Sequence, residues 1–151
     1  MAIVISAERP DSIDARNLVE ELEAQLAPLY PRESRHGYSV DELMVEGVYF
    51  VVIRDASTPA GCAGVQLFGS GYGELKRMYV RPQFRRSGFA KSLLQHLSDY
   101  ARSRGVRLLR LETGIHQQAA IRLYEQAGFR TIPPFGAYKD DPLNRFYEKR
   151  I

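Results

Sequence analysis

Short β-prone runs of apolar residues mark the first half of the chain. Thr58–Gly61 and Gly69–Gly73 are rich in turn-forming residues, and we expect them to be turns between strands. The predicted strands cover Ile3–Ile5, Val48–Ile53, Cys62–Phe68 and Glu74–Val80. Because the last three follow one another with only a turn between each pair, the middle third of the chain predicts an antiparallel meander.

Helical spacing of apolar residues begins near the N-terminus and dominates the second half. The first helix is expected to open at Pro10-Asp11, with Asp11 as its N-cap, and to end at Pro28. Its apolar stripe consists of Leu18, Val19, Leu22 and Leu26. Later helices are predicted over Ser39–Met44, Gly88–Ser103 and Gln117–Ala127, and later strands over Val106–Leu111, Phe129–Ile132 and Arg145–Arg150. A meander followed by alternating strands and helices predicts an α/β fold whose mixed sheet is flanked by helices.

Composition narrows the class of protein. The 151 residues, 44% hydrophobic and 26% charged, are typical of one globular domain, which we expect to span residues 1–151. The single cysteine, Cys62, excludes an internal disulfide framework and a cysteine-based zinc cluster, and no metal is expected. The chain has no apolar run near the roughly 20 residues of a membrane span, and its N-terminus lacks the pattern of a signal peptide. We therefore expect a cytoplasmic protein with no membrane partner.

One segment concentrates the positive charge. The net charge of +3 is too mild to indicate nucleic-acid binding, but residues 76–91 carry six basic residues and no acidic one. The middle of this segment is the turn that leads into the strongest predicted helix. The first N–H groups of a helix are unpaired and lie at the positive end of its dipole, so they bind anions, phosphates especially. On charge alone, a basic loop whose Gly88 only eases a turn explains the segment equally well.

The pattern within and after this segment resembles the GNAT superfamily of N-acetyltransferases. Arg85-x-x-Gly88-x-Ala90, between a strand and a helix, is similar to the family's Arg/Gln-x-x-Gly-x-Gly/Ala signature. Met78-Tyr79-Val80-Arg81-Pro82 resembles the strand end that precedes that loop, and Glu112-Thr113 closes the next strand. Leu123-Tyr124-Glu125-Gln126-Ala127-Gly128-Phe129 is similar to the family's Leu-Tyr-x-x-x-Gly-Phe motif. Together these matches cover about Gly61 to Thr131.

The resemblance implies acetyl-coenzyme A as the acetyl donor. In the family, a bulged strand splays from its neighbour, and backbone groups of that strand hold the pantetheine arm in the gap. The pyrophosphate would lie on the amides of residues 86–90, and Gln117 stands where the family often has an asparagine that contacts pantetheine. The implied cofactor-binding residues are Met78, Tyr79, Val80, Arg85, Arg86, Ser87, Gly88, Phe89, Ala90, Lys91 and Gln117.

The chemistry of acetyl transfer calls for a base and an acid. An alkyl ammonium with a pKa near 10.4 is neutral in only about one molecule in 2,500 at pH 7, so a base or a water relay must remove its proton. The resemblance points to Glu74, which stands six residues before Val80, as the base, and to Tyr124 as the proton donor to the departing thiolate. Glu112 is a competing base, and a core tyrosine and a paired strand-end glutamate are the plainer alternatives. Strand alternation places Glu74 and Lys76 on one face and Leu75 and Arg77 on the other.

These inferences predict a GNAT-fold N-acetyltransferase that transfers acetyl directly to an amine in a ternary complex. His36 lies in the polar segment after the first helix, where the family builds its acceptor pocket, and Tyr138 lies in the polar loop between the last two strands; we expect both to contact the acceptor. The acceptor would be a small-molecule or peptide amine, which the sequence does not identify; no nucleic-acid partner is expected, and a homodimer is an expectation from the family alone. Three alternatives stay open: a transferase of a longer acyl group, a noncatalytic acyl-CoA-binding module and a small nucleic-acid-binding domain.

Overall fold

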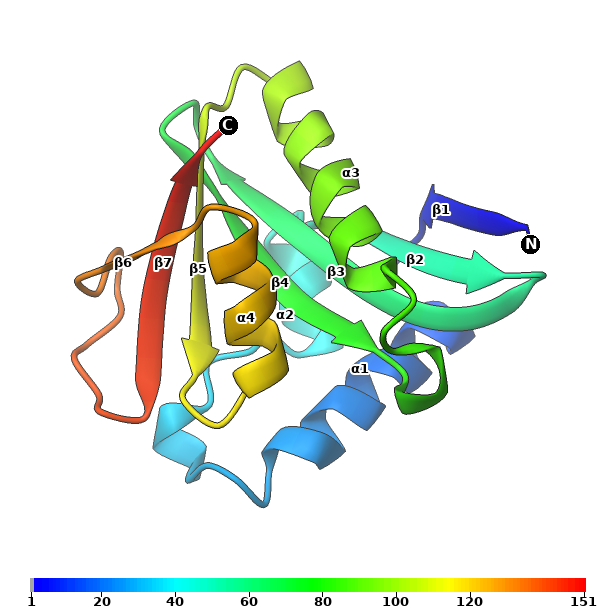
Figure 1. Cartoon of the computed structure of the whole chain (residues 1–151), viewed down its shortest axis with the longest axis horizontal. Coiled ribbons are helices and arrows are strands. Elements are labelled where there is room, and N and C mark those ends of the chain that lie inside the picture. The colour runs from blue at the N-terminus through cyan, green and yellow to red at the C-terminus, as the bar shows by residue number, and fades with distance from the viewer. Residues whose placement is uncertain (1) are drawn as a thin grey trace.

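The computed structural model describes residues 2–151, which form one seven-stranded sheet with helices on both faces (Figure 1). The strand order across the sheet is β1-β2-β3-β4-β5-β7-β6. The strands are β1 (Ile3–Ala7), β2 (Tyr49–Asp55), β3 (Thr58–Phe68), β4 (Tyr72–Val80), β5 (Leu108–Gly114), β6 (Arg130–Ile132) and β7 (Asn144–Arg150). The helices are α1 (Ile13–Leu26), α2 (Val40–Val45), α3 (Phe89–Ser103) and α4 (Gln118–Gln126). The predicted mixed sheet is confirmed: β2, β3 and β4 form an antiparallel meander, and β4 pairs with β5 in parallel.

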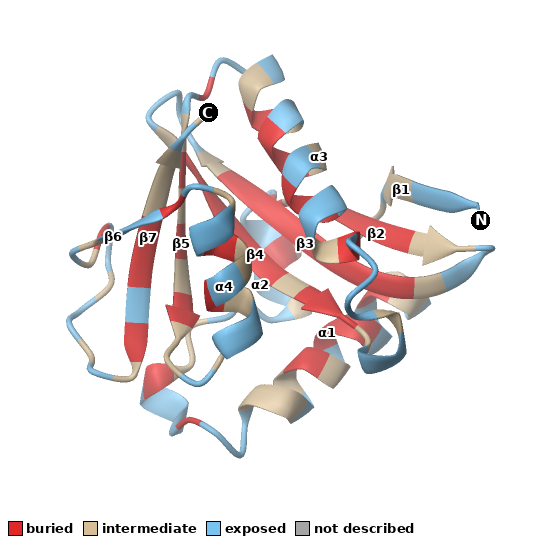
Figure 2. Cartoon of the chain, viewed as in Figure 1, coloured by how far each residue is buried: buried red, intermediate tan, exposed pale blue. Residues whose placement is uncertain are grey.

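The two faces of the sheet carry separate apolar cores. On one face, α3 and α4 cover a core that includes Leu93, Leu97 and Leu109. On the other face, the stripe of α1 and Leu43 of α2 pack against Phe50 of β2. Figure 2 shows the burial concentrated in the central strands, whereas the edge strand β1 is largely exposed. None of the helices within residues 2–151 has the length and apolar character needed to cross a bilayer.

Two predictions about where elements begin were wrong. The N-cap of α1 is Ser12, whose hydroxyl accepts a hydrogen bond from Ala15 N at 3.1 Å, whereas Asp11 pairs with Arg9. The segment Thr58–Gly61 is the start of β3 and not a turn, because the chain reverses at residues 56 and 57, which both have positive φ. Pro59 fits in this strand because the register with β2 shifts beside it, at a bulge.

Strand β4 contains a bulge and also diverges from β5, and the divergence leaves an opening in the sheet. Cys62 pairs with Tyr79 and Gly64 with Lys76, so two residues of β4, Arg77 and Met78, lie opposite one residue of β3. Arg77 has a φ of 53°, and its side chain lies on the α1 face, not on the face of Leu75 as simple alternation predicts. The bulge is the reason, because it adds one residue and shifts the alternation of side chains.

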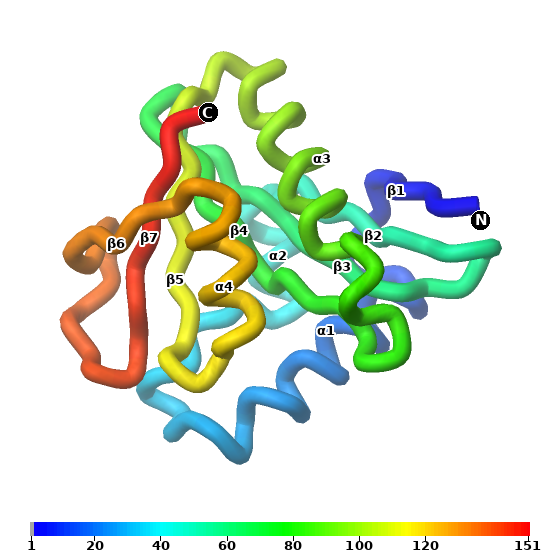
Figure 3. The backbone as a smooth tube through the Cα atoms, viewed as in Figure 1, coloured from blue at the N-terminus to red at the C-terminus, as the bar shows by residue number. Residues whose placement is uncertain are grey.

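After Glu74, and so before the bulge, β4 and β5 are no longer paired. They are paired only at residues 73–74 of β4 and 109–110 of β5, near the N-terminal end of β4. The splayed, bulged strand that the resemblance implied is therefore confirmed. The tube in Figure 3 follows the two strands as they separate, with α4 beside β5 and α1 below the open end.

Candidate active site

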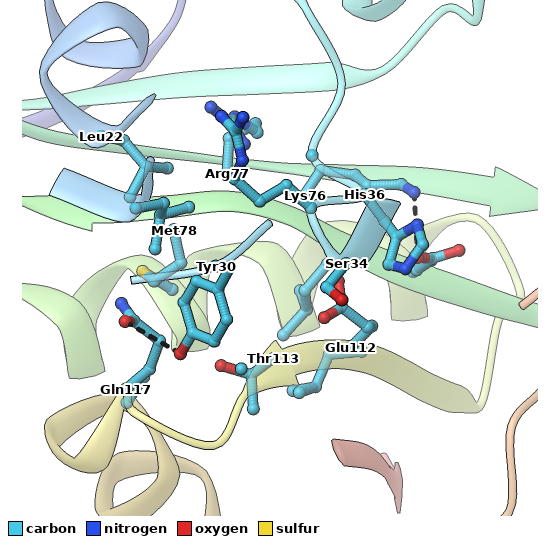
Figure 4. A pocket seen from close by; sticks show the side chains of 18 of the residues that line it. Leu22, Tyr30, Ser34, His36, Lys76, Arg77, Met78, Glu112, Thr113 and Gln117 are labelled. Carbon is cyan, nitrogen blue, oxygen red and sulfur yellow. Dashed lines mark hydrogen bonds and ion pairs between the residues drawn. The ribbon is translucent and has the colours of Figure 1, made fainter. Parts of the chain in front are cut away.

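A cleft of about 120 Å³ lies where β4 and β5 diverge. Figure 4 shows Lys76, Arg77 and Met78 of β4 on one side of it and Glu112 and Thr113 of β5 on the other. The segment that follows α1 covers the cleft, and α4 contributes its first turns. The residues that line the cleft include Tyr30, Arg35, His36, Glu74, Lys76, Arg77, Met78, Glu112, Gln117, Tyr124 and Tyr138.

Glu74 is held in a buried hydrogen-bonded cluster. Its Oε2 accepts a hydrogen bond from Lys76 Nζ at 2.9 Å and another, short one from the Tyr138 hydroxyl. The Lys76 ammonium also lies 4.0 Å from the centre of the Tyr38 ring. Burial, and after it the charge of Glu74, raises the pKa of Tyr138, so this phenol stays protonated and donates. His36 meets the Tyr138 ring edge-on, with 5.4 Å between ring centres.

Glu112 faces the same cleft from β5 but has fewer partners. Its Oε2 accepts a hydrogen bond from Asn144 Nδ2 at 2.8 Å. Withdrawal of the carboxylate from water, and after it the charge of Glu74, raises the pKa of Glu112 to about 7. The Glu112 carboxyl can therefore gain and lose a proton near neutral pH.

Tyr124 reaches the cleft from α4. Its ring is 5% exposed and packs edge-on against Phe129 in the core beneath α3 and α4. The hydroxyl makes no hydrogen bond to any group within residues 2–151. Burial raises the pKa of the phenol, with a smaller contribution from the charge of Glu112, so the proton stays on the oxygen and is available to a ligand.

The loop between β4 and α3 presents a row of free backbone donors. The first backbone amide of α3 with an acceptor is that of Ser92, which donates to Gly88 O at 3.0 Å. The amides of residues 86–91 have no acceptor among residues 2–151. Arg86 and Gly88 both have positive φ, 64° and 79°, a backbone arrangement that forms an anion-binding concavity. The space beside Gly88 is open, since a Cβ there would meet nothing within 4 Å.

Most of the basic side chains in this segment are bound within the fold. Three residues of α1 accept from three of the arginines: Glu21 from Arg81 at 2.8 Å, Glu23 from Arg77 at 2.7 Å and Gln25 from Arg85 at 2.7 Å. Arg85 Nε also donates to Val80 O at 2.9 Å. Only Arg86 and Lys91 of the segment's basic side chains are exposed without such a partner among residues 2–151. The amides of the loop are thus its main free donors.

Comparison with known proteins agrees with this geometry. The profile of the Acetyltransferase (GNAT) family matches residues 15–129. The chain belongs to this family. It is 39% identical to the IAA acetyltransferase of Azospirillum brasilense over 150 residues, which are 99% of this chain and 98% of that protein.

Solved structures of GNAT proteins share the fold. A Klebsiella pneumoniae protein, assigned as an acyl-CoA N-acyltransferase, superposes with a TM-score of 0.81 at 34% identity, over 98% of this chain and 97% of its own. The PaiA N-acetyltransferase of Thermoplasma acidophilum, solved with coenzyme A, superposes with a TM-score of 0.80 at 20% identity over 100% of both chains. At that low identity the second match shows the fold alone.

Within this GNAT protein, Gln117 lies at the N-cap of α4 and lines the cleft. Its side chain is 3.4 Å from the hydroxyl of Tyr30, which also accepts from His116 N at 2.9 Å (Figure 4). The Tyr30 ring occupies the space where a Cβ on Gly114 would lie, so it packs directly on the end of β5. Tyr30 could not be predicted as a site residue, because nothing local in the sequence indicates that the segment after α1 packs against the start of α4.

The cleft brings together six of the predicted site residues. They are His36, Glu74, Met78, Gln117, Tyr124 and Tyr138. Tyr79 is different: its ring packs in the core beneath α1, its hydroxyl donates to Glu21 at 3.2 Å, and it does not line the cleft. Phe89 is buried against Phe84, which leaves only its backbone amide for a ligand.

Proposed function

We propose that this GNAT protein transfers the acetyl group of acetyl-coenzyme A directly to an amine held in the cleft between β4 and β5. The observation that carries the proposal is the meeting, in one cleft, of a carboxyl with a pKa of about 7, Glu112, and a phenol without a partner, Tyr124. An acetyl transferase needs both groups, one to accept a proton from the amine and one to donate a proton to the leaving thiolate.

The free amides of residues 86–91 fit the phosphates of coenzyme A. Their row of donors, at the N-terminus of α3, complements a group that carries several negative charges. The exposed Arg86 and Lys91 add charge at the same place, and the side chain of Ser87 adds a polar group. The coenzyme A complex of the Thermoplasma acidophilum protein, which shares this fold, supports the choice of ligand.

The gap beside the bulge fits the pantetheine arm. Since Arg81 N donates to Ala60 O, strand alternation turns the N–H of Val80 away from β3 and toward the gap, whereas the Val80 carbonyl already accepts from Arg85 Nε. Met78, Ala90 and Gln117 are proposed to contact the arm together with Val80. The backbone N–H of Met78 or Val80 is proposed to stabilise the oxyanion that forms on the thioester carbonyl.

We propose Glu112 as the proton acceptor and keep Glu74 as the alternative. Glu74 Oε2 accepts from the Lys76 ammonium and from Tyr138, whereas Glu112 accepts only from Asn144 Nδ2 among residues 2–151, so Glu112 has fewer contacts to give up when it takes a proton from the amine. The pKa of Glu112, about 7, is suited to accept a proton at neutral pH. In this scheme the amine nitrogen bonds to the acetyl carbon as its proton moves to Glu112, and the C–S bond breaks as Tyr124 protonates the sulfur. Glu74 then serves to hold Lys76 and Tyr138 in place.

The test combines thermal unfolding with a thiol-release assay. Coenzyme A at about 100 times its Kd should stabilise the fold by about 2.7 kcal/mol, and free thiol should appear only when acetyl-coenzyme A and an amine are both present. Stabilisation by coenzyme A with no thiol release from any amine would instead indicate a noncatalytic binding module. Faster release from a longer acyl-coenzyme A would revise the donor, and tight oligonucleotide binding that weakens steeply with salt would contradict the proposal.

A further inference from the structure

A second, larger cavity of about 470 Å³ adjoins the cleft at its outer end. The two cavities share part of their walls, including Arg35, His36, Lys76 and Tyr138. A molecule whose amine enters the cleft would therefore place the rest of its structure in this outer cavity. Its size lies within the range of small-molecule binding sites.

The walls of the outer cavity are rich in aromatic rings. Phe68 and Tyr72, on either side of the turn between β3 and β4, stack with 4.8 Å between ring centres. Phe68 is 39% exposed although it is large and apolar. Tyr38 and Tyr138 line the same cavity from the loops that flank it. This arrangement leaves aromatic surface available to a ring of the ligand, since aromatic pairs favour stacked and edge-on contacts.

One guanidinium group, that of Arg35, lines both cavities, and that of Arg77 lies beside it in the cleft. Arg35 and Arg77 share one carboxylate, that of Glu23, at 3.2 and 2.7 Å. The Nε atoms of both arginines are buried and have no hydrogen-bond partner among residues 2–151, and the Arg77 side chain is only 3% exposed. Because these Nε atoms are withdrawn from solvent, a ligand in the cavity would reach Arg35 through the exposed part of its side chain, which is 24% exposed. A carboxylate is the ligand that suits a guanidinium.

The remaining charges do not compete for that carboxylate or attract a polycation. Lys76 is neutralised by Glu74. Glu42 is the acid that lines the outer cavity, and its Oε1 already accepts from Ser39 N in the capping box of α2. Within residues 2–151 the wall of this cavity therefore offers a polyamine no cluster of acids.

We propose that the acceptor is a small aromatic amino acid: its ring lies against Phe68 and Tyr72, its carboxylate on Arg35, and its amine points inward to the cleft. This inference rests on the proposed function and names the substrate class of the same site. Because Arg35 lines both cavities, a carboxylate bound there leaves an α-amino group, two bonds away, at their junction. The N-terminal residue of a peptide has no free carboxylate beside its α-amino group, and alkyl polyamines lack both the aromatic ring and the carboxylate.

The experiment measures kcat/KM for a matched set of acceptors with saturating acetyl-coenzyme A. The kcat/KM for phenylalanine should exceed that for phenethylamine, which lacks the carboxylate, by about 10-fold or more, since hydrogen bonds to charged groups are worth about that ratio. It should exceed the kcat/KM for alanine, which lacks the ring, by about 2- to 10-fold. Spermidine and a peptide with a free N-terminus should be poorer acceptors than phenylalanine.

Two variants test the contacts, each with an internal control. Arg35→Gln should lower kcat/KM for phenylalanine by about 10-fold or more, mainly through KM, and leave phenethylamine within about 2-fold. Phe68→Ala should lower kcat/KM for phenylalanine and leave kcat/KM for alanine unchanged. Val45→Ala, at a residue of α2 that is 83% exposed, serves as the matched surface control.

The possible results separate the two proposals. Equal loss for phenylalanine and phenethylamine in Arg35→Gln would overturn the carboxylate contact, because the variant would then act through the fold. Preference for spermidine or the peptide would overturn the substrate class while leaving the acetyl-transfer function intact. Absence of thiol release from every amine, with coenzyme A still bound, would overturn the proposed function and this inference together.

Discussion

Replacing Glu112 with glutamine should make the protein more stable and less active at the same time. In the folded protein the pKa of Glu112 is raised from 4.5 to about 7. At 1.36 kcal/mol for each pH unit between the folded and unfolded values, the ionised carboxylate destabilises the fold by about 3 kcal/mol. Glutamine removes the charge and keeps an oxygen that can accept from Asn144 Nδ2.

The sign of the effect depends on pH. Below about pH 4 the carboxyl is protonated in both the folded and unfolded chains, so it does not affect the free energy of unfolding. As the pH rises toward 7, the unfolded chain ionises first and the wild-type protein loses stability. The penalty is complete above the folded pKa, so the gain from Glu112→Gln should appear at pH 8 and vanish at pH 4.

Thermal unfolding measures this difference directly. For a domain of about this size, 1 kcal/mol corresponds to about 2 to 4 °C, so Tm of Glu112→Gln should exceed that of the wild type by about 6 to 12 °C at pH 8. At pH 4 the two values should coincide. A variant that is equally or less stable at pH 8 would refute the argument that the Glu112 carboxylate is destabilised in its cleft.

The same variant tests catalysis through its pH profile. A base with a pKa of about 7 predicts a wild-type kcat/KM that rises about tenfold from pH 6 to 8 and then levels off. The variant should fall about 10²- to 10⁴-fold at pH 7 and should keep rising toward the pKa of the acceptor amine, because only the neutral amine then reacts. A profile unchanged by the substitution would return the role of base to Glu74.

Three further variants test other parts of the site. Tyr124→Phe keeps the ring and should lower kcat about 10²-fold at an unchanged KM for acetyl-coenzyme A; a kcat within about threefold of wild type, with chemistry rate-limiting, would leave Tyr124 a core residue. Gly88→Asp should weaken coenzyme A binding, measured by calorimetry, far more than Gly88→Ala does. The alanine variant shares the backbone strain at a φ of 79° but adds no charge. Equal affinities of the two variants for coenzyme A would refute the proposed position of the phosphates. Glu74→Gln should cost about 3 to 5 kcal/mol in urea unfolding because it leaves Lys76 buried without its partner; a second substitution, Lys76→Met, should restore most of that loss, and no recovery would indicate that the ion pair is not the cause.

Features that depend on residues close to one another in the chain could be predicted from the sequence. The order of strands and helices follows from the spacing of apolar residues, and the free amides before α3 follow from any helix that begins after a glycine turn. The prediction of a turn at Pro59 was wrong because of a neighbouring strand. The sequence around Pro59 is typical of a turn, but Pro59 is part of β3 because a bulge against β2 accommodates it.

The chemistry of the site depends on contacts between segments that lie far apart in the chain. Tyr138 meets Glu74 across 64 positions and Arg77 meets Glu23 across 54, and no local pattern pairs these residues. The bulge that turns Arg77 toward α1 reverses the face that alternation assigns to it. Glu112 and Glu74 are both glutamates on adjoining strands. Their surroundings differ: Glu74 accepts from Lys76 Nζ and the Tyr138 hydroxyl, whereas Glu112 accepts only from Asn144 Nδ2 among residues 2–151. Withdrawal from water raises the pKa of Glu112, so the tertiary environment, and not the residue type, suits this carboxyl to exchange a proton near neutral pH.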